Sequence, residues 1–186
     1  MATIFTHALV GAALAHAAPV QVSRRRLLAC AALLAVLPDV DVLGFSGGIA
    51  YEHPLGHRGL SHSLTFAVLA GLLAVLLGFR DVSLRSWKGG TLVLLLTLAT
   101  ASHGVLDAFT DAGLGVGFLI PFDASRSFAP WRPLATSPIG VDAFFSHSML
   151  AILVNEVVWV WLPTGVCLVG VTLWRRRAQR FRSACT

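Results

Sequence analysis

The chain has 186 residues, which suits one domain and is short for two. Hydrophobic residues make up 56% of it and charged residues 12%, whereas a soluble domain usually carries about 25% charged residues. This composition excludes an ordinary soluble domain and predicts that lipid surrounds most of the chain. The net charge of +5 does not indicate nucleic-acid binding, because the basic residues form short clusters beside apolar segments, as in membrane loops.

Five apolar segments follow one another, each near the roughly 20 residues that span a bilayer core. They run from Ile4 to Val22, Leu27 to Leu43, Leu60 to Phe79, Thr91 to Phe109 and Met149 to Trp174. Pro38 and Gly44 close the second segment, and Pro163 predicts a kink in the fifth. We interpret the first as a retained helix rather than a signal peptide, since no Lys or Arg precedes Arg24. The prediction is an all-α, multi-pass transmembrane bundle of about five helices, with residues 1–186 forming a single membrane-embedded domain.

Lys and Arg gather in three stretches of the chain. These stretches, 24–26, 80–88 and 175–182, hold three, three and five of the 14 basic residues. By the positive-inside rule they face the cytoplasm, which predicts a plasma (inner) membrane protein with its N-terminus outside and its C-terminus cytoplasmic. The connections 44–59 and 110–148 then face outward. The second is long for a structureless loop, so we expect it to cover something.

Histidines and aspartates converge on the outer side of this topology, although only Lys and Arg were used to derive it. In chain order, helix ends and outer loops carry His7, Asp39, Asp41, His57, Arg58, His62, His103, Asp107, Asp111, Asp142 and His147. Ionisable groups are costly near a bilayer and clustered carboxylates repel one another, so a divalent cation is the natural compensating charge. His103 and Asp107 are four apart and project from one helix face, which lets both hold one ion. Imidazole with carboxylate is a common zinc ligand set.

Each of these patterns also has a plain structural explanation. A lone His-x-x-x-Asp spacing is a weak signal, and Pro-Asp-x-Asp equally suits a solvated helix end. Ser61 or Ser63 suits an N-cap for the third helix. Glu156 and Asn155 either line the cavity or make interhelical hydrogen bonds. The joint placement of the His and Asp residues is what favours a metal site.

Four blocks of sequence give the chain a family resemblance. They are Thr6-His7, Pro38-Asp39-Val40-Asp41, His57-Arg58-Gly59-Leu60-Ser61-His62-Ser63 and His103-Gly104-Val105-Leu106-Asp107. With these blocks, in this order, the chain resembles the YdjM-type membrane-bound predicted metal-dependent hydrolases. The third block is the most specific. The resemblance implies an integral membrane protein with hydrolase activity, and the family is distantly similar to zinc-dependent phospholipase C enzymes.

The predicted site is an outward-facing centre for a divalent metal, with zinc as the expected ion. The expected ligands are His7, Asp41, His62, His103 and Asp107. Asp39 and His57 are expected to support the ligands or act as general bases, and Arg58 to bind an anionic substrate group bidentately. The expected reaction is hydrolysis of an ester, a phosphodiester being favoured. The lipid bilayer is the expected partner, and a lipid could reach the site laterally as substrate.

Two other classes of protein would use the same residues. A metal-ion or proton-coupled transporter needs a polar path to the cytoplasm, whereas the cytoplasmic halves of the second, third and fourth helices are nearly all apolar. A non-catalytic membrane scaffold would hold a structural metal in a closed site of four protein ligands, while a catalytic zinc site keeps one position open. The hydrolase and the scaffold differ in that open position.

Overall fold

The computed structural model describes the backbone of residues 1–140 and 148–184. Its elements are α1 (Ile4–Ala17), α2 (Arg24–Val36), η1 (Leu37–Gly47), η2 (Leu60–His62), α3 (Leu64–Gly78), α4 (Trp87–Ala108), α6 (Ser148–Glu156), η3 (Val157–Trp161) and α7 (Leu162–Ala184). Within these residues the only β-type pairing consists of two isolated bridges in the long connection after α4. The all-α prediction is confirmed.

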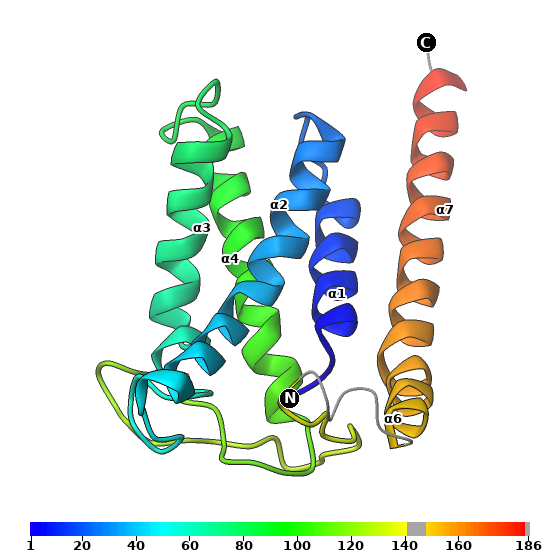
Figure 1. The fold of residues 1–186 in the computed structure, drawn as a ribbon. Coiled ribbons are helices and arrows are strands. Elements are labelled where there is room, and N and C mark those ends of the chain that lie inside the picture. The colour runs from blue at the N-terminus through cyan, green and yellow to red at the C-terminus, as the bar shows by residue number, and fades with distance from the viewer. Residues whose placement is uncertain (141–147, 185–186) are drawn as a thin grey trace.

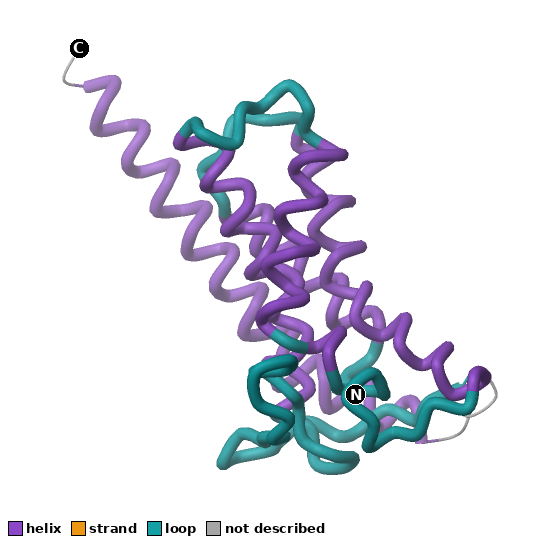
Figure 2. The backbone as a smooth tube through the Cα atoms, turned by 90° about the vertical axis from the view of Figure 1, so that its left-hand side faces the viewer, coloured by secondary structure: helices purple, strands orange, loops and turns teal. Residues whose placement is uncertain are grey.

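Three helical stretches are long and apolar enough to cross a membrane, namely Arg24–Gly47, Trp87–Ala108 and Met149–Arg180, while α1 and α3 are shorter apolar helices. Helices α1 to α4 stand side by side as an up-and-down bundle (Figure 1). The continuous run α6–η3–α7 lies beside α1 and crosses the bundle obliquely when the view is turned (Figure 2). The five predicted apolar segments therefore correspond to five helical passes.

Proline residues lie where helix α1 ends and where the second pass changes from α-helix to 3₁₀-helix. Pro19 disfavours helical backbone in the residue before it, so α1 ends at Ala17 and Ala18 is extended. The second pass continues beyond α2 as the 3₁₀-helix η1, which has Pro38 in its first turn and ends before Gly48 in a left-handed conformation. The fifth pass contains the π-helical turn η3, which ends shortly before the predicted kink at Pro163.

Serine hydroxyls begin the next two helices. The Ser63 side chain accepts a hydrogen bond from the Phe66 amide, and that of Ser86 accepts one from the Gly89 amide. These caps make α3 begin four residues later, and α4 four residues earlier, than the apolar patterns predict. The N-cap interpretation of Ser63 is confirmed.

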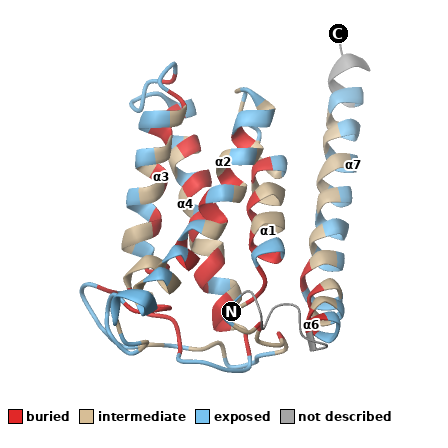
Figure 3. Cartoon of the chain, viewed as in Figure 1, coloured by how far each residue is buried: buried red, intermediate tan, exposed pale blue. Residues whose placement is uncertain are grey.

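Small residues let neighbouring helices approach closely. A Cβ atom on Gly11 of α1 would lie 2.5 Å from the Ala31 carbonyl oxygen of α2. One on Gly71 of α3 would lie 2.5 Å from the Thr97 hydroxyl of α4. Such contacts are typical of membrane helices, whose association depends on close packing rather than on burial from water. Exposed and intermediate residues lie along the outer sides of these helices, as expected for a lipid-facing surface (Figure 3).

One end of the bundle has an entirely apolar interior. The side chains that form it are Ala15, Leu27, Ala31, Leu34, Val75, Phe79, Val82, Leu92, Leu95, Leu96 and Ala99. The α1–α2 and α3–α4 connections and the C-terminal end of α7 lie at this end, and the N-terminus lies at the other (Figure 1).

Contacts between the basic stretches confirm that they share this end. Arg26 pairs with Asp81 at 3.3 Å, and Arg175 donates to the His16 carbonyl oxygen at 3.2 Å. That this end faces the cytoplasm stays a prediction.

Candidate metal centre

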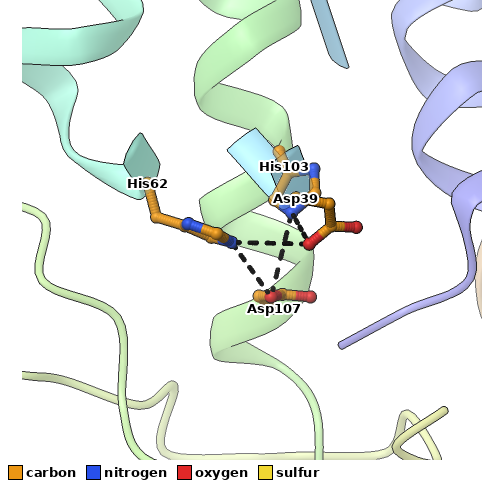
Figure 4. A group of neighbouring side chains, drawn as sticks. All are labelled: Asp39, His62, His103 and Asp107. Atoms are coloured by element: carbon orange, nitrogen blue, oxygen red, sulfur yellow. Dashed lines mark ion pairs between the residues drawn. The ribbon is translucent and has the colours of Figure 1, made fainter. Parts of the chain in front are cut away.

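Four of the residues that the sequence singled out meet at the N-terminal end of the bundle. Asp39 comes from η1, His62 from η2, and His103 and Asp107 from the last turns of α4 (Figure 4). One ligand atom from each lies within 4.8 Å of the other three, and all four residues are buried. These four residues are called the His–Asp cluster below.

The facing atoms of the cluster lack hydrogen-bond partners. His103 Nε2 lies 3.2 Å from Asp39 Oδ1 and 3.9 Å from Asp107 Oδ2. His62 Nε2 lies 3.8 Å and 3.6 Å from the same two oxygens. None of the four atoms has a hydrogen-bond partner among the described residues. Buried polar atoms are rarely left unpaired, and two imidazole nitrogens with two carboxylate oxygens fit a divalent metal such as zinc.

The other ring nitrogen of each histidine is already held. His103 Nδ1 lies 2.7 Å from the Ala35 carbonyl oxygen and must donate to it, which leaves the Nε2 lone pair facing the cluster. His62 Nδ1 lies 3.1 Å from Asp41 Oδ2, an oxygen that also accepts from the Ser61 hydroxyl. Metal-bound histidines usually donate their second N–H to a carbonyl or carboxylate in this way.

Asp41 therefore lies one step behind the cluster. Its Oδ1 is 2.7 Å from His57 Nδ1, while its Oδ2 holds His62. The structure places the two aspartates in positions opposite to those expected, because Asp39 faces the cluster and Asp41 orients a histidine. Asp41, His57 and His62 are also close enough to hold an ion themselves. Both imidazole Nδ1 atoms of that group are already paired with Asp41, which favours an orienting role.

Arg58 is fully buried, and its guanidinium is occupied by the protein. Its Nε lies 3.2 Å from Asp107 Oδ2, Nη1 donates to the carbonyls of Ala112 and Leu114, and Nη2 donates to the Thr110 hydroxyl. Its backbone has φ +61°, a left-handed conformation that is costly for a bulky residue. These contacts give no support to the expectation that Arg58 binds a substrate anion. They tie the connection after α4 to the cluster and offset the charge of Asp107.

His7 lies beside the cluster and outside its four-atom group. Its ring stacks on that of His103 with centroids 3.6 Å apart, and its Nε2 is 3.5 Å from Asp107 Oδ1. Both His7 ring nitrogens are buried without a hydrogen-bond partner among the described residues. A role for His7 as a ligand stays a prediction.

The charges of the site leave room for a divalent cation. Asp39, Asp41 and Asp107 carry three negative charges and Arg58 one positive charge, so two negative charges remain when the histidines are neutral. Burial by itself lowers the pKa of His62, but hydrogen bonds and attraction from Asp107 and Asp41 outweigh it and raise the pKa to about 9. Without a metal, a proton on His62 supplies part of the compensating charge.

Gly104 allows η2 to approach α4. A Cβ atom at this position would lie 2.9 Å from the His62 carbonyl oxygen and 3.3 Å from the Phe118 ring. Glycine in the His-Gly-Val-Leu-Asp block is thus what lets His62 lie against the helix that carries His103 and Asp107.

The long connection after α4 covers the site, as the sequence predicted. The Gly117 amide donates to the Arg58 carbonyl at 2.9 Å, and the Leu64 amide donates to the Phe118 carbonyl at 3.0 Å. Asn155 holds the far part of the same connection, because its side chain accepts from the Ala135 amide and donates to the Pro133 carbonyl.

A buried carboxylate holds the start of α1. Glu156 accepts from the Thr3 amide and hydroxyl, both at 2.5 Å, and from the Thr6 hydroxyl at 2.7 Å. Trp161 Nε1 also donates to the Thr6 hydroxyl. Of the two alternatives for Glu156, interhelical hydrogen bonding is the one found. Sequence reasoning missed Thr3, and the only local signal was a threonine at an N-cap position before an apolar run.

The remaining candidates lie apart from the cluster. Asp111 accepts from the amide and hydroxyl of Thr136 in the covering connection. His16 is exposed at the opposite end of α1. Asp142 and His147 lie outside the described residues.

Apolar helices enclosing a buried His–Asp cluster define an integral membrane protein with a candidate metal centre. A family model described as YdjM inner membrane protein matches residues 1–178, and the chain belongs to this family. It is 40% identical over 180 residues to the Escherichia coli (strain K12) protein named Inner membrane protein YbcI, covering 95% of this chain and 100% of that protein. No solved structure matches the chain. These relatives support the prediction of an inner-membrane location.

Proposed function

We propose that the protein is a zinc-dependent membrane hydrolase that cleaves an ester at the His–Asp cluster. The observation that carries this proposal is the convergence of four buried ligand atoms, none with a hydrogen-bond partner in the part of the chain that the structure describes. A divalent metal bound there would polarise the ester and lower the pKa of a water molecule from 15.7 to about 7, giving a nucleophile at neutral pH.

The protein side chains would hold this site ready before a substrate arrives. The Ala35 carbonyl and the Asp41 carboxylate fix the orientation of His103 and His62, so little rearrangement is needed. Neither oxygen of Asp39 has a hydrogen-bond partner among residues 1–140 and 148–184, so the oxygen not directed at the cluster is available to accept a proton from the attacking water. Asp39 is thus proposed as the general base and His57 as a support for Asp41. His62, His103 and Asp107 are proposed as the ligands, which leaves the open position that distinguishes a catalytic site from a structural one.

Arg58 is proposed as a positioning residue. With its donors directed at Asp107, Thr110 and backbone carbonyls, it does not favour a phosphodiester over a carboxylic ester. The choice between these substrates is therefore left to the assay. We retain the prediction that the cluster faces away from the cytoplasm.

The interior of the bundle supports an enzyme over a transporter. The apolar core, which includes Leu27, Leu92 and Leu96, fills the space between the cluster and the other end. An ion crossing this region would lose its hydration without finding polar replacements, which is strongly unfavourable.

Metal content and hydrolysis should be measured together on detergent-purified protein. Wild type and His16→Ala are expected to bind one equivalent or more of zinc and to cleave members of a panel of phosphodiesters and carboxylic esters. His103→Ala should lose both properties. A wild-type protein with full metal that cleaves nothing in the panel would remove the hydrolase proposal and favour a structural metal. Zinc uptake into proteoliposomes without hydrolysis would favour a transporter.

A further inference from the structure

A pocket of about 470 Å³ lies next to the His–Asp cluster. Its walls come from the start of α1, from η1 and from residues 137–140 of the covering connection. The volume is within the roughly 300–1,000 Å³ typical of small-molecule sites. The side chains that line it are mainly apolar, including those of Ile4, Phe5, Val42 and Ile139.

Asp39 joins this pocket to the proposed metal centre. Among the described residues of the lining, it is the only one with an ionisable side chain, and it is also a member of the cluster, 3.2 Å from His103 Nε2. A molecule in the pocket therefore has apolar walls along most of its length and reaches the metal ligands at one point. An amphiphile with a long apolar part and an ester at its end has this distribution of polarity.

Exposed apolar side chains border the pocket. Ile4 and Phe5 are 47% and 51% exposed at the start of α1, and Ile139 is 41% exposed on the opposite wall. Val40, in the same helix as Val42, is 54% exposed. In a membrane protein, exposed apolar side chains of this kind contact acyl chains, so a chain can move from the bilayer into the pocket without crossing water.

We propose that this pocket binds one acyl chain of a membrane lipid and thereby brings the lipid ester to Asp39 and the metal. Cleavage of that ester rests on the proposed hydrolase function, whereas binding of the chain does not. The substrate class is therefore a membrane lipid whose scissile ester lies close to an acyl chain.

Photo-crosslinking can test chain binding without any catalysis. The full-length protein is placed in vesicles of phosphatidylethanolamine and phosphatidylglycerol that contain phosphatidylglycerol with a diazirine near the end of one acyl chain. After irradiation, labelled peptides are mapped by mass spectrometry. We expect labelling of the segments around Phe5 and Ile139 to exceed that of exposed lipid-facing residues elsewhere by several-fold.

Two pairs of variants separate the pocket from the general lipid surface. Val42→Trp fills the pocket and should reduce labelling near Phe5 and Ile139 several-fold, while Leu43→Trp, on the neighbouring exposed residue, should not. Ile139→Trp and its control Leu119→Trp repeat the comparison from the opposite wall.

Each outcome of this experiment decides one of the two proposals. Equal labelling along all lipid-facing helices, unchanged in both pocket variants, would overturn the pocket assignment even if wild type hydrolyses esters. Labelling confined to the pocket in a protein that cleaves nothing would keep the lipid-binding site and remove the hydrolase. Unchanged zinc content in Val42→Trp and Ile139→Trp confirms that the variants fold.

Discussion

His62 Nδ1 lies 3.1 Å from Asp41 Oδ2, while the Nε2 atom of the same ring faces Asp39 and Asp107. The carboxylate thus holds the proton of this imidazole on the side away from the cluster. Asp41 and the Ser61 hydroxyl, which lies 3.0 Å from the same Nδ1, together decide which nitrogen is free for a metal. Both lie outside the cluster, so the effect of Asp41 on metal binding can be separated from that of a ligand.

Asp41→Asn should weaken zinc binding by about 10–100-fold without abolishing it, the usual effect of losing a partner behind a ligand. His103→Ala should reduce zinc content to background, because it removes a ligand atom. Competition with a chromogenic chelator measures both. Asp111→Asn is the matched control, since the Asp111 side chain bonds only to Thr136 in the described contacts and lies apart from the cluster. Wild-type affinity in Asp41→Asn would show that Asp41 does not orient His62.

Arg58→Ala should destabilise the fold by about 3–5 kcal/mol, as expected when one partner of a buried ion pair is removed. Arg58→Lys should recover only part of this, because lysine keeps the charge but loses the fork that reaches Asp107, Thr110 and two carbonyls. Thermal unfolding in detergent, with and without zinc, provides the measurement. Zinc should restore part of the lost stability, because the cation offsets the negative charge of Asp107 that Arg58 no longer balances.

The exposed Arg132, which lies over the Phe128 ring, supplies the control for that series. Arg132→Ala should change the unfolding temperature little. If Arg58→Ala behaved like Arg132→Ala, the buried role of Arg58 would be wrong, and its side chain would have to be accessible to a substrate.

Gly104→Ala should weaken zinc binding and lower stability by about 1–3 kcal/mol, because the new methyl group lies against the His62 carbonyl and overpacks the contact between η2 and α4. Gly90→Ala in the same helix has open space around the added carbon and should be neutral or slightly stabilising, since alanine favours helix more than glycine. Zinc titration of both variants makes the comparison. Equal zinc affinities would mean that η2 can shift away from α4 without moving the His62 ring out of the cluster.

Cysteine-accessibility labelling in a cysteine-free background tests the orientation. Ser46→Cys should react with an impermeant reagent from outside the cell, and Ser83→Cys only after the membrane is opened, because the basic stretches favour the cytoplasm. Ser46 is exposed in η1 and Ser83 is exposed in the connection between α3 and α4, so folding should not block the reagent. The reverse pattern would place the His–Asp cluster on the cytoplasmic side.

The sequence by itself determined the membrane class, the five helical passes and the end at which the His and Asp residues gather. Each of these follows from properties that act locally along the chain. Apolar length decides which segments enter lipid, and clustered Lys and Arg set the common end of two connections and the C-terminal part of α7. The spacing of His103 and Asp107 likewise fixes a shared helix face without any knowledge of neighbours.

Only the tertiary structure decided which aspartate faces the cluster. Asp39 and Asp41 are two residues apart in η1, and at three residues per turn their side chains point in directions about 120° apart. Both have apolar neighbours, so the sequence contains no local signal for the inward one. Packing of η1 against α4 and η2 turned Asp39 toward His103 and left Asp41 to His57 and His62.

The burial of Arg58 and Glu156 was decided in the same way. Thr110, which bonds to Arg58, lies 52 positions away from it in the sequence. Thr3, which bonds to Glu156, lies 153 positions away. A buried charge is tolerated only where the fold supplies matching donors or acceptors, and those partners exist only once distant segments have been brought together.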